Sequence, residues 1–367
     1  FHTGVMRGNC NEFAGKKVES AKELVKEKLL QNNEADIMHD LSEEVVCRCG
    51  SNVIIKKIDN QWFIRYSDSD LTEMSNEHAK NMSILPKEYY DNVQGVLDWF
   101  QDRACARLGN WLGTKLPFDE EWTIEPISDS TLYPAYYIIS PYVNSGKINV
   151  EDLNEDFFDY VFLGKDSIVR NKNVADEVRK DFEYWCPLDI NLGGKEHKTV
   201  HFPVFIMNHV AILEKEYWPR GIFVNWWVTG SGSKISKSKG GAEPIPGAIE
   251  KYSVDGMRLY YAHIGSPHAD VVWDAEVVAN YKNVLERVFN IVNEVKSLKH
   301  KTGLIDKWLE SVLNETVKLV TGCMERFELR DAANMIYFQT LENLRWYLRR
   351  GGSNTKLLKE FIGTWVR

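Results

Sequence analysis

The pattern of apolar and polar residues divides the chain into two parts. Up to about residue 253, short apolar runs bounded by Gly, Pro and Ser alternate with segments of helical spacing. Residues 18–30 and 203–213 have helical spacing, and so does 85–106, where Pro86 favours a helix start. Residues 53–58 and 62–66 follow a tight turn at 47–52 and fit short strands.

Two apolar runs, at 133–139 and 221–228, fit either a buried strand or the start of a core helix. Alternation of such runs with helices predicts a parallel α/β sheet. After residue 253 the spacing is helical throughout. Ser253 can cap a helix through residue 263, and the segments 275–298, 304–323, 329–348 and 357 onward are long and amphipathic. This second part is typical of a helical bundle.

Composition narrows the class of protein. A chain of 367 residues has room for roughly two or three domains. The net charge of −8 argues against a binder of nucleic acid that is basic all over, although a local basic face is enough for RNA. The six cysteines are scattered, which indicates a reducing, cytoplasmic setting. No apolar run approaches the roughly 18 residues of a membrane span. The first residue is Phe1, and we expect a part of a longer chain rather than a trimmed mature protein.

The strongest motif is the lysine loop, residues 234–240, which reads Lys-Ile-Ser-Lys-Ser-Lys-Gly between Gly- and Ser-rich flanks. Lysines supply point charges, hydroxyls supply hydrogen bonds, and glycines let the loop move. Such a loop suits a phosphoryl or nucleotidyl reaction, in which negative charge must be stabilised as it develops. The alternative is a solvated surface loop.

The lysine loop resembles the Lys-Met-Ser-Lys-Ser signature of the class I aminoacyl-tRNA synthetases, with Ile235 at the position of Met. Segments at 125–133, 193–202, 205–212, 218–222 and 255–260 resemble the archaeal and eukaryotic leucine-specific family in order and spacing. The resemblance implies an α/β fold: the second half of a Rossmann-like catalytic domain followed by an all-α helical bundle. It assigns 1–83 to the trailing edge of an editing insertion and a small connective module, 84–252 to the catalytic half, 253–276 to a connecting helical segment, and 277–367 to an incomplete anticodon-binding type of bundle.

The resemblance also implies roles for single residues. Lys237 would contact the phosphates of ATP with help from Lys234, and Ser236 and Ser238 would order the loop. Three residues match the glycine-rich segment that meets the adenosine ribose: Gly193, Gly194 and Glu196. Glu196 has the alternative of a surface acid beside two lysines.

Four residues match the pocket for the amino acid and the adenylate: Ser128, Asp129, Ser130 and Tyr133. Without the resemblance, Asp129 between two serines reads as a helix cap. His209 is a weaker candidate for contact with ATP, since a lone histidine in an apolar run is more often a satisfied core residue.

The family activates its amino acid with ATP, for which we expect magnesium as the accompanying ion, and transfers it to tRNA. The resemblance therefore predicts ATP, leucine and tRNA(Leu) as partners, and no membrane. Family members carry a His-x-Gly-His motif ahead of the lysine loop. Residues 263–266 do not match it, because they end in Ser and follow the loop. We therefore expect the motif on a separate N-terminal half, and we expect this chain to be inactive alone. Isoleucine or valine specificity, a nucleotidyltransferase of related fold, and a non-catalytic tRNA-binding subunit are the alternatives.

Cys47 and Cys49 raise the question of zinc. A structural zinc site needs four ligands, and no second close pair follows. We therefore predict no metal site, although relatives often place a small zinc module here.

Overall fold

The computed structural model describes residues 4–47, 49–230, 233–235, 244–265 and 268–366. The chain forms two compact units, Phe1–Gln61 and Trp62–Arg367. The first unit contains η1 (Asn11–Phe13) and α1 (Val18–Gln31), which confirms the helix expected at 18–30. The division falls earlier than the boundary expected after residue 83, because helix α2 (Ser69–Asn81) packs on the core of the second unit through Ala79.

The strand expected at 53–58 was a wrong prediction. No strand forms there in the described part of the first unit, and the apolar side chains lie in solvent, with Ile54 81% exposed. The turn before it does form, closed by a bridge between Val46 and Asn52. An apolar run becomes a strand only when a partner supplies its hydrogen bonds and covers one face.

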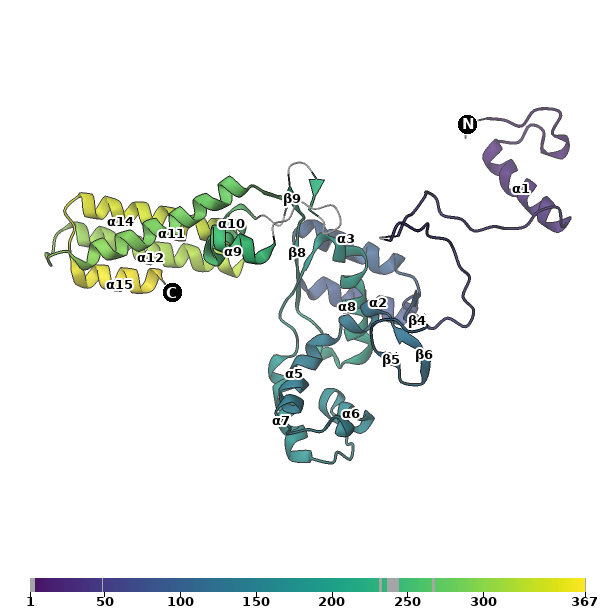
Figure 1. Ribbon diagram of the computed structural model, residues 1–367, viewed down its shortest axis with the longest axis horizontal. Helices are drawn as coiled ribbons and strands as arrows, with labels where there is room; N and C mark the ends of the chain where they lie inside the picture. Colours follow the sequence, from purple (N-terminus) through teal and green to yellow (C-terminus); the bar gives the residue numbers. More distant parts are fainter. Residues whose placement is uncertain (1–3, 48, 231–232, 236–243, 266–267, 367) are drawn as a thin grey trace. The chain divides into compact units, whose positions relative to one another are not determined.

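The second unit is built on a parallel sheet of β2 (Ser83–Leu85), β8 (Gly221–Asn225) and β7 (Asn191–Gly194), in the order β2-β8-β7 (Figure 1). This confirms the predicted α/β class. Of the apolar run at 221–228, residues 221–225 form a strand rather than the start of a helix. Ile222 and Val224 of β8 enter the main core together with side chains from α2, α3 (Lys87–Trp99) and α8 (His201–Ile212). β8 is buried on both faces, as the middle strand of a covered parallel sheet must be.

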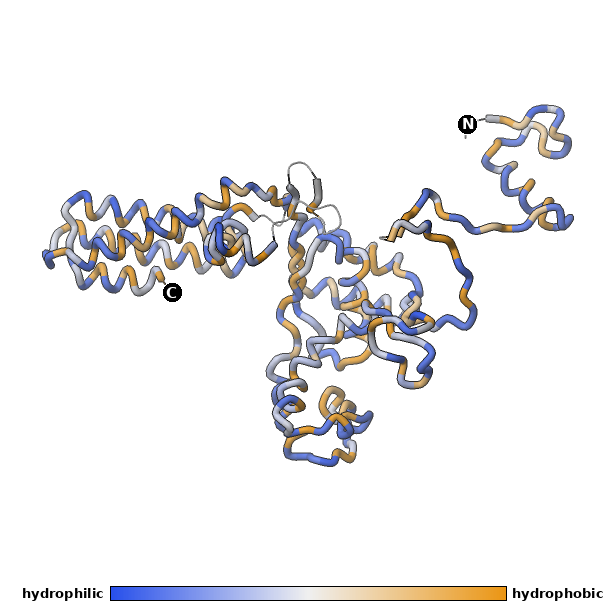
Figure 2. Tube along the Cα trace, in the orientation of Figure 1, coloured by the Kyte–Doolittle hydropathy of each residue, from blue (hydrophilic) through white to orange (hydrophobic). Residues whose placement is uncertain are grey.

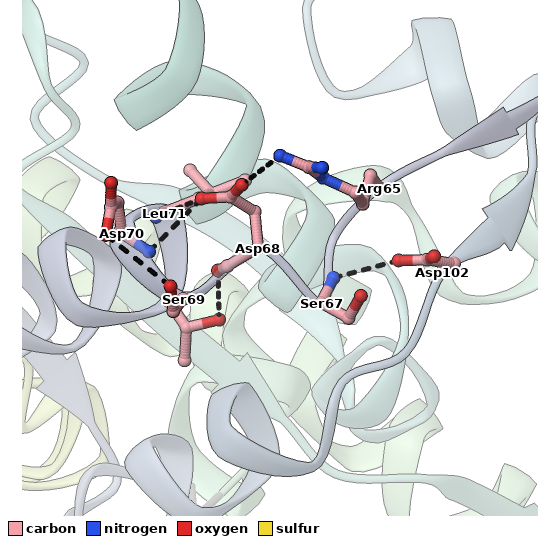
Figure 3. Close-up of polar contacts among 8 residues, drawn as sticks. Arg65, Ser67, Asp68, Ser69, Asp70, Leu71 and Asp102 are labelled. Atoms are coloured by element: carbon pink, nitrogen blue, oxygen red, sulfur yellow. Dashed lines mark hydrogen bonds and ion pairs between the residues drawn. The ribbon is translucent and has the colours of Figure 1, made fainter.

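Helix α2 begins at Asp68, whose carboxylate accepts hydrogen bonds from the backbone N–H groups of Asp70 at 3.1 Å and Leu71 at 3.2 Å (Figure 3). These bonds satisfy amides that the first helical turn leaves free. The bond from Leu71 is the main reason that the pKa of Asp68 is lowered, and the hydrogen bond from Arg65 lowers it further. The carboxylate of Asp102 accepts from the backbone N–H of Ser67 at 3.0 Å, which ties the same turn to the chain after α3.

Helix α3 begins after Pro86, as predicted, but it ends at Trp99 rather than near residue 106. The chain then forms β3 (Arg103–Ala104), which pairs with β1 (Phe63–Ile64), and enters a small antiparallel sheet. That sheet has the order β4-β6-β5 and comprises β4 (Ala106–Leu108), β5 (Lys115–Leu116) and β6 (Asp119–Ile124).

A helical cluster separates this sheet from β7. The run at 133–139 is the start of a helix and not a strand. The cluster comprises α4 (Pro126–Ser130), α5 (Tyr133–Asn144), η2 (Val150–Asp152), α6 (Glu155–Leu163) and α7 (Lys172–Trp185). Its own apolar core includes Ile138, Val161 and Phe182.

Beyond β8, the chain forms a hairpin and two helices. β9 (Val228–Gly230) pairs with β10 (Ser233–Lys234) in antiparallel fashion and with β11 (Val271–Trp273) in parallel. Helices α9 (Ile245–Tyr252) and α10 (Val254–Ile264) lie between β10 and β11 in sequence. The Ser253 hydroxyl accepts from the backbone N–H of Gly256 at 3.1 Å, which confirms the predicted helix cap.

The end of the chain is helical, as predicted. It comprises α11 (Ala275–Lys296), α12 (Ile305–Glu325), α13 (Leu329–Ala333), the π-helical turn η5 (Asn334–Gln339), α14 (Thr340–Arg349) and α15 (Thr355–Trp365) (Figure 1). Hydrophilic and hydrophobic residues alternate along these helices (Figure 2), and the apolar ones meet in a core around Leu309, Leu344 and Phe361. Among the described helices, none has the length and apolar character needed to cross a membrane.

Candidate functional site

A pocket of about 540 Å³ lies where β7 and β8 end. In parallel α/β sheets, ligands bind beyond the carboxyl ends of the strands. Gly194 and Glu196 line the pocket on one side, and Ile235, which follows directly on Lys234, lines it on another. The structure therefore brings the glycine-rich segment and the beginning of the lysine loop to one site.

Close packing favours glycine at Gly193, and the lack of a side chain at Gly194 leaves room for the carboxylate of Glu196. A Cβ atom on Gly193 would lie 2.7 Å from Cζ of the fully buried Phe202, and one on Gly194 would lie 2.5 Å from Oε2 of Glu196. Contacts this short do not occur between real side chains, so any larger residue forces a neighbour to move. Gly194 thus lets the Glu196 carboxylate fold against the backbone at the mouth of the pocket.

Aromatic and apolar side chains to which the sequence assigned no site role form most of the remaining wall. They come from the end of β8, from α9, from α10 and from β11: Trp226, Trp227, Ile245, Ala248, Met257, Tyr261 and Trp273. Flat apolar walls with a few polar groups are typical of sites for small molecules and nucleotides. Trp226 and Trp227 lie near the end of the apolar run that leads toward the lysine loop, several residues before it, and this is the signal that could have found them.

A basic pair is held against the wall of the pocket. The Lys195 ammonium lies 3.9 Å from the centre of the Trp226 ring, and the Lys198 ammonium lies 5.4 Å from it. Cation–π contacts of this length orient an ammonium group and hold the indole in place. Both lysines belong to η3 (Lys195–Thr199), the turn that also carries Glu196. The entry to the pocket therefore carries positive charge before the lysine loop is counted.

The lysine loop is described only at its beginning. Lys234 lies in β10, where its backbone pairs with Thr229, and the backbone N–H of Ile235 donates to the Val228 carbonyl at 3.4 Å. Ser236, Lys237 and Ser238 lie outside the described residues, as does the side chain of Lys234. Because β9 also pairs with β11, the start of the loop is tied to two strands.

The segment expected to meet the amino acid is anchored by Asn208, a residue 6% exposed. The Tyr66 hydroxyl donates to Oδ1 of Asn208 at 2.8 Å. Nδ2 of Asn208 donates to Oγ1 of Thr131 at 2.8 Å and to the Ser128 carbonyl at 3.4 Å. Burial of the Tyr66 hydroxyl raises its pKa to about 12, so it remains a donor. One buried amide therefore fixes the end of α4 to α8.

In the described part of the chain, none of the four residues expected at the amino-acid pocket lines the pocket beyond β7. Asp129 is partly buried, and burial raises the pKa of its carboxyl group, with Glu125 adding to the effect. Tyr133 begins α5, is 49% exposed, and packs its ring edge-on against Tyr137 at 5.5 Å. Ser128 and Ser130 lie in α4, which Glu125 caps by accepting from the Ile127 N–H at 2.8 Å. The residue that caps the helix in this segment is therefore Glu125.

His209 lies away from the pocket of Gly194 and Glu196. It lines a separate apolar pocket of about 260 Å³. Its Nδ1 lies 2.7 Å from the Phe205 carbonyl, and burial lowers its pKa to about 4. The imidazole is therefore neutral, and its hydrogen bond is made within α8. This fits the alternative of a buried core histidine better than a contact with ATP.

Cys47 and Cys49 are free and exposed. A hydrogen bond with the Ser51 side chain is the main reason that the pKa of the Cys49 thiol is lowered to about 7. No group of three or more His, Cys, Asp or Glu residues suited to a metal ion is found within the described ranges.

Comparisons with known proteins define the class. A family model described as "tRNA synthetases class I (M)" matches residues 163–296, and one described as "Anticodon-binding domain of tRNA ligase" matches residues 306–367. The methionyl-tRNA synthetase of Mycobacterium tuberculosis in complex with methionyl-adenylate superposes with a TM-score of 0.59 at 16% identity, covering 85% of this chain and 57% of that one. This likeness shows the fold. The chain belongs to the class I aminoacyl-tRNA synthetases.

Within that class, leucine--tRNA ligases match this chain over all or nearly all of its length. The enzyme of Archaeoglobus fulgidus is 37% identical over 100% of this chain and 40% of its own length, and that of Methanocaldococcus jannaschii is 40% identical over 99% of this chain and 40% of its own length. The chain is a member of the leucine--tRNA ligase family and spans about 40% of the length of the relatives it matches.

Proposed function

We propose that this chain supplies one side of the active site for ATP-dependent activation of leucine and for transfer of the leucyl group to tRNA(Leu). The observation that carries the proposal is the single pocket that joins Gly194 and Glu196 to the start of the lysine loop. Similarity to part of the leucine--tRNA ligases, over nearly all of this chain, supports leucine as the amino acid. Isoleucine, valine and a non-catalytic tRNA-binding role are the competing proposals.

In the reaction, the leucine carboxylate attacks the α-phosphorus of ATP, and pyrophosphate leaves. The enzyme's contribution is positioning and stabilisation of charge, without covalent chemistry of its own. The Glu196 carboxylate can accept hydrogen bonds from ribose hydroxyls, and the aromatic walls can pack on the base. Lys237, assisted by Lys234, would stabilise the phosphate charge as the loop closes, and Ser236 and Ser238 would order the loop. Magnesium would accompany ATP as the ion bound to its phosphates.

The second half of the reaction requires tRNA. Residues 306–367 match the anticodon-binding family model, which supports placing tRNA on the helical end. Arg350 lies 4.4 Å from the Trp346 ring, so a guanidinium group is held on an aromatic face there. Arginine is suited to phosphate contacts, which supply much of the affinity for RNA. A cytoplasmic location, where tRNA and ATP are available, is part of the same proposal.

The experiment is leucine-dependent exchange of pyrophosphate into ATP. The sample is the enzyme assembled from this chain and a segment carrying the first half of the catalytic domain. Lys237→Ala should lower the exchange rate about 100-fold, the usual effect of removing one preorganised charge contact. Lys239→Ala is the matched control and should change the rate much less. Equal losses would contradict the assigned roles.

Specificity is tested in the same assay with isoleucine or valine in place of leucine. Exchange driven by either of these would replace leucine in the proposal. If no amino acid drives exchange in any assembled enzyme while the chain still binds tRNA(Leu), the non-catalytic tRNA-binding role is correct.

A further inference from the structure

A phenylalanine occupies a position that usually requires glycine. Helix α12 ends in a Schellman motif: the backbone N–H of Glu328 donates to the Cys323 carbonyl at 2.8 Å, and that of Phe327 donates to the Met324 carbonyl at 3.1 Å. The left-handed residue in such a motif is Phe327, with a φ of 59°. Glycine is preferred there because a Cβ atom makes the left-handed conformation costly. A side chain retained at this position needs a contact that offsets the strain.

That contact is with the middle strand of the parallel sheet. The Phe327 and Phe223 rings lie 5.7 Å apart between centroids at an interplanar angle of 48°. Phe223 belongs to β8, where it pairs with Leu85 on one side and Leu192 on the other. Side chains alternate along a strand, so Phe223 faces away from the core that holds Ile222 and Val224. Phe327 thus helps to cover the second face of β8.

The same joint reaches the opposite wall of the pocket. We define the α12–α14 joint as residues 327–338. Near its end, the Phe338 ring lies 4.6 Å from the ring of His263 in α10. Helix α10 carries Met257 and Tyr261, both of which line the pocket. One short segment therefore contacts the strand that leads into the pocket and the helix that forms its other side.

The backbone of the joint departs from regular α-helix at both ends, and side-chain hydrogen bonds stabilise it near its second end. After α13, the chain makes the π-helical turn η5, a rare form that often marks functional sites. The Trp365 indole N–H donates to the Ile336 carbonyl at 2.7 Å, and the Thr340 hydroxyl donates to the Met335 carbonyl at 2.8 Å. These side-chain bonds satisfy carbonyl groups of the π-helical turn, so the geometry of the joint is built into the bundle.

We propose that Phe327 is a positioning residue for the nucleotide pocket, acting through Phe223 and β8. The α12–α14 joint holds the strand wall and the helix wall of the pocket at a fixed separation. Loss of the Phe327 ring releases β8 from the joint while Phe338 still holds α10, so the two walls are no longer fixed to each other. The identity of the ligand as ATP rests on the proposed function, whereas the mechanical role of Phe327 does not.

Hydrogen–deuterium exchange on this chain tests the mechanical role. Phe327→Ala and Phe327→Gly should both speed exchange in the peptide covering 221–230, and leave the peptide covering 254–264, together with α5 and α6, unchanged. Phe289→Ala, which removes a ring 67% exposed on α11, is the matched control and should change neither region. Faster exchange confined to the end of α12 would overturn the proposal.

Kinetics in the assembled enzyme separate positioning from stability. Both variants should raise KM for ATP about tenfold, a typical coupling between sites, with kcat changed less than twofold. Phe327→Leu should restore most of the affinity. Glycine tolerates the left-handed conformation, so Phe327→Gly should melt at or above the temperature of Phe327→Ala. If KM instead follows the melting temperature, with the glycine variant close to wild type, Phe327 is only a helix cap and the proposal fails. An assembled wild-type enzyme without exchange activity would refute the proposed function, and hydrogen–deuterium exchange would still decide the role of Phe327.

Discussion

Replacing Asn208 with alanine tests how the segment expected to meet the amino acid is held. Asn208 of α8 makes three hydrogen bonds: to Tyr66, to Thr131 at the end of α4, and to the Ser128 carbonyl within α4. Tyr66 is 2% exposed and Thr131 is 1% exposed, so neither can turn to water when the amide is removed.

The magnitude follows from the partners left behind. A hydrogen bond in a folded protein contributes about 1 kcal/mol net, and a buried group left without a partner costs about 1–3 kcal/mol. Two buried hydroxyls lose their partner, and the third bond is longer, at 3.4 Å. We therefore expect Asn208→Ala to lower the free energy of unfolding by about 3–4 kcal/mol. Tyr66→Phe removes one bond and should cost about 1–2 kcal/mol.

Urea unfolding of the two single variants and the double variant gives the coupling between Asn208 and Tyr66. Because the residues share a bond, their effects should not add, and the interaction energy should reach about 1 kcal/mol. Asn293→Ala, an exposed asparagine on α11, is the control and should stay within about 0.5 kcal/mol of wild type. Asn208→Ala within 0.5 kcal/mol of wild type, or strict additivity with Tyr66→Phe, would refute the argument that this amide anchors α4.

Three further predictions concern packing, pH and metal. Gly193→Ala should lower the free energy of unfolding in urea by about 2 kcal/mol, because the added Cβ would meet buried Phe202. The control Gly95→Ala lies in open space on α3 and should raise that free energy by about 0.5–1 kcal/mol. The opposite order would be inconsistent with the packing. The neutral His209 has a pKa near 4 when folded and about 6.5 when unfolded, so the unfolded chain binds the extra proton and stability falls by up to about 3 kcal/mol as pH drops from 6.5 to 4. That pH-dependent loss should disappear in His209→Leu, and its persistence would assign it to another group. Elemental analysis of the purified chain should find less than one zinc per chain, because two cysteines form half a structural site; one tightly held zinc would show that they are ligands.

The helices could be predicted from the sequence because their signals are local. The spacing of apolar residues and the Ser253 cap are read within one element, and both are confirmed. The sequence left 133–139 open between a strand and a helix, because Tyr133 and Tyr137 look like core residues in an apolar run. In the structure both are exposed on α5. The strand at 53–58 was wrong because strand formation depends on a partner that the sequence does not display.

Within the candidate site, only the residues that belong to recognisable motifs could be predicted from the sequence. Glu196 and Ile235 come from recognisable segments, and the fold brings both to one pocket. Tyr261 belongs to no motif, and Trp273 matches the family only as part of the segment that leads to the helical end. Only the fold places both in the wall of the pocket with Trp226. His209 showed the reverse case: a polar residue that stood out in the sequence is satisfied by a carbonyl of its own helix.

Residues on the two faces and at the end of β8 have different roles, in stability or in function. Ile222 and Val224 pack into the main core, so substitutions there should act on the stability of the sheet. Phe223 is 7% exposed and faces Phe327, so substitutions there act on how the helical end holds the strand. The end of the strand leads into Trp226 and the lysine loop, where the chemistry is expected. Because Phe223 lies on the short strand that runs directly into Trp226, a displacement on the Phe223 face is passed on toward the pocket. A strand placed in this way makes the pocket sensitive to contacts that never touch the ligand.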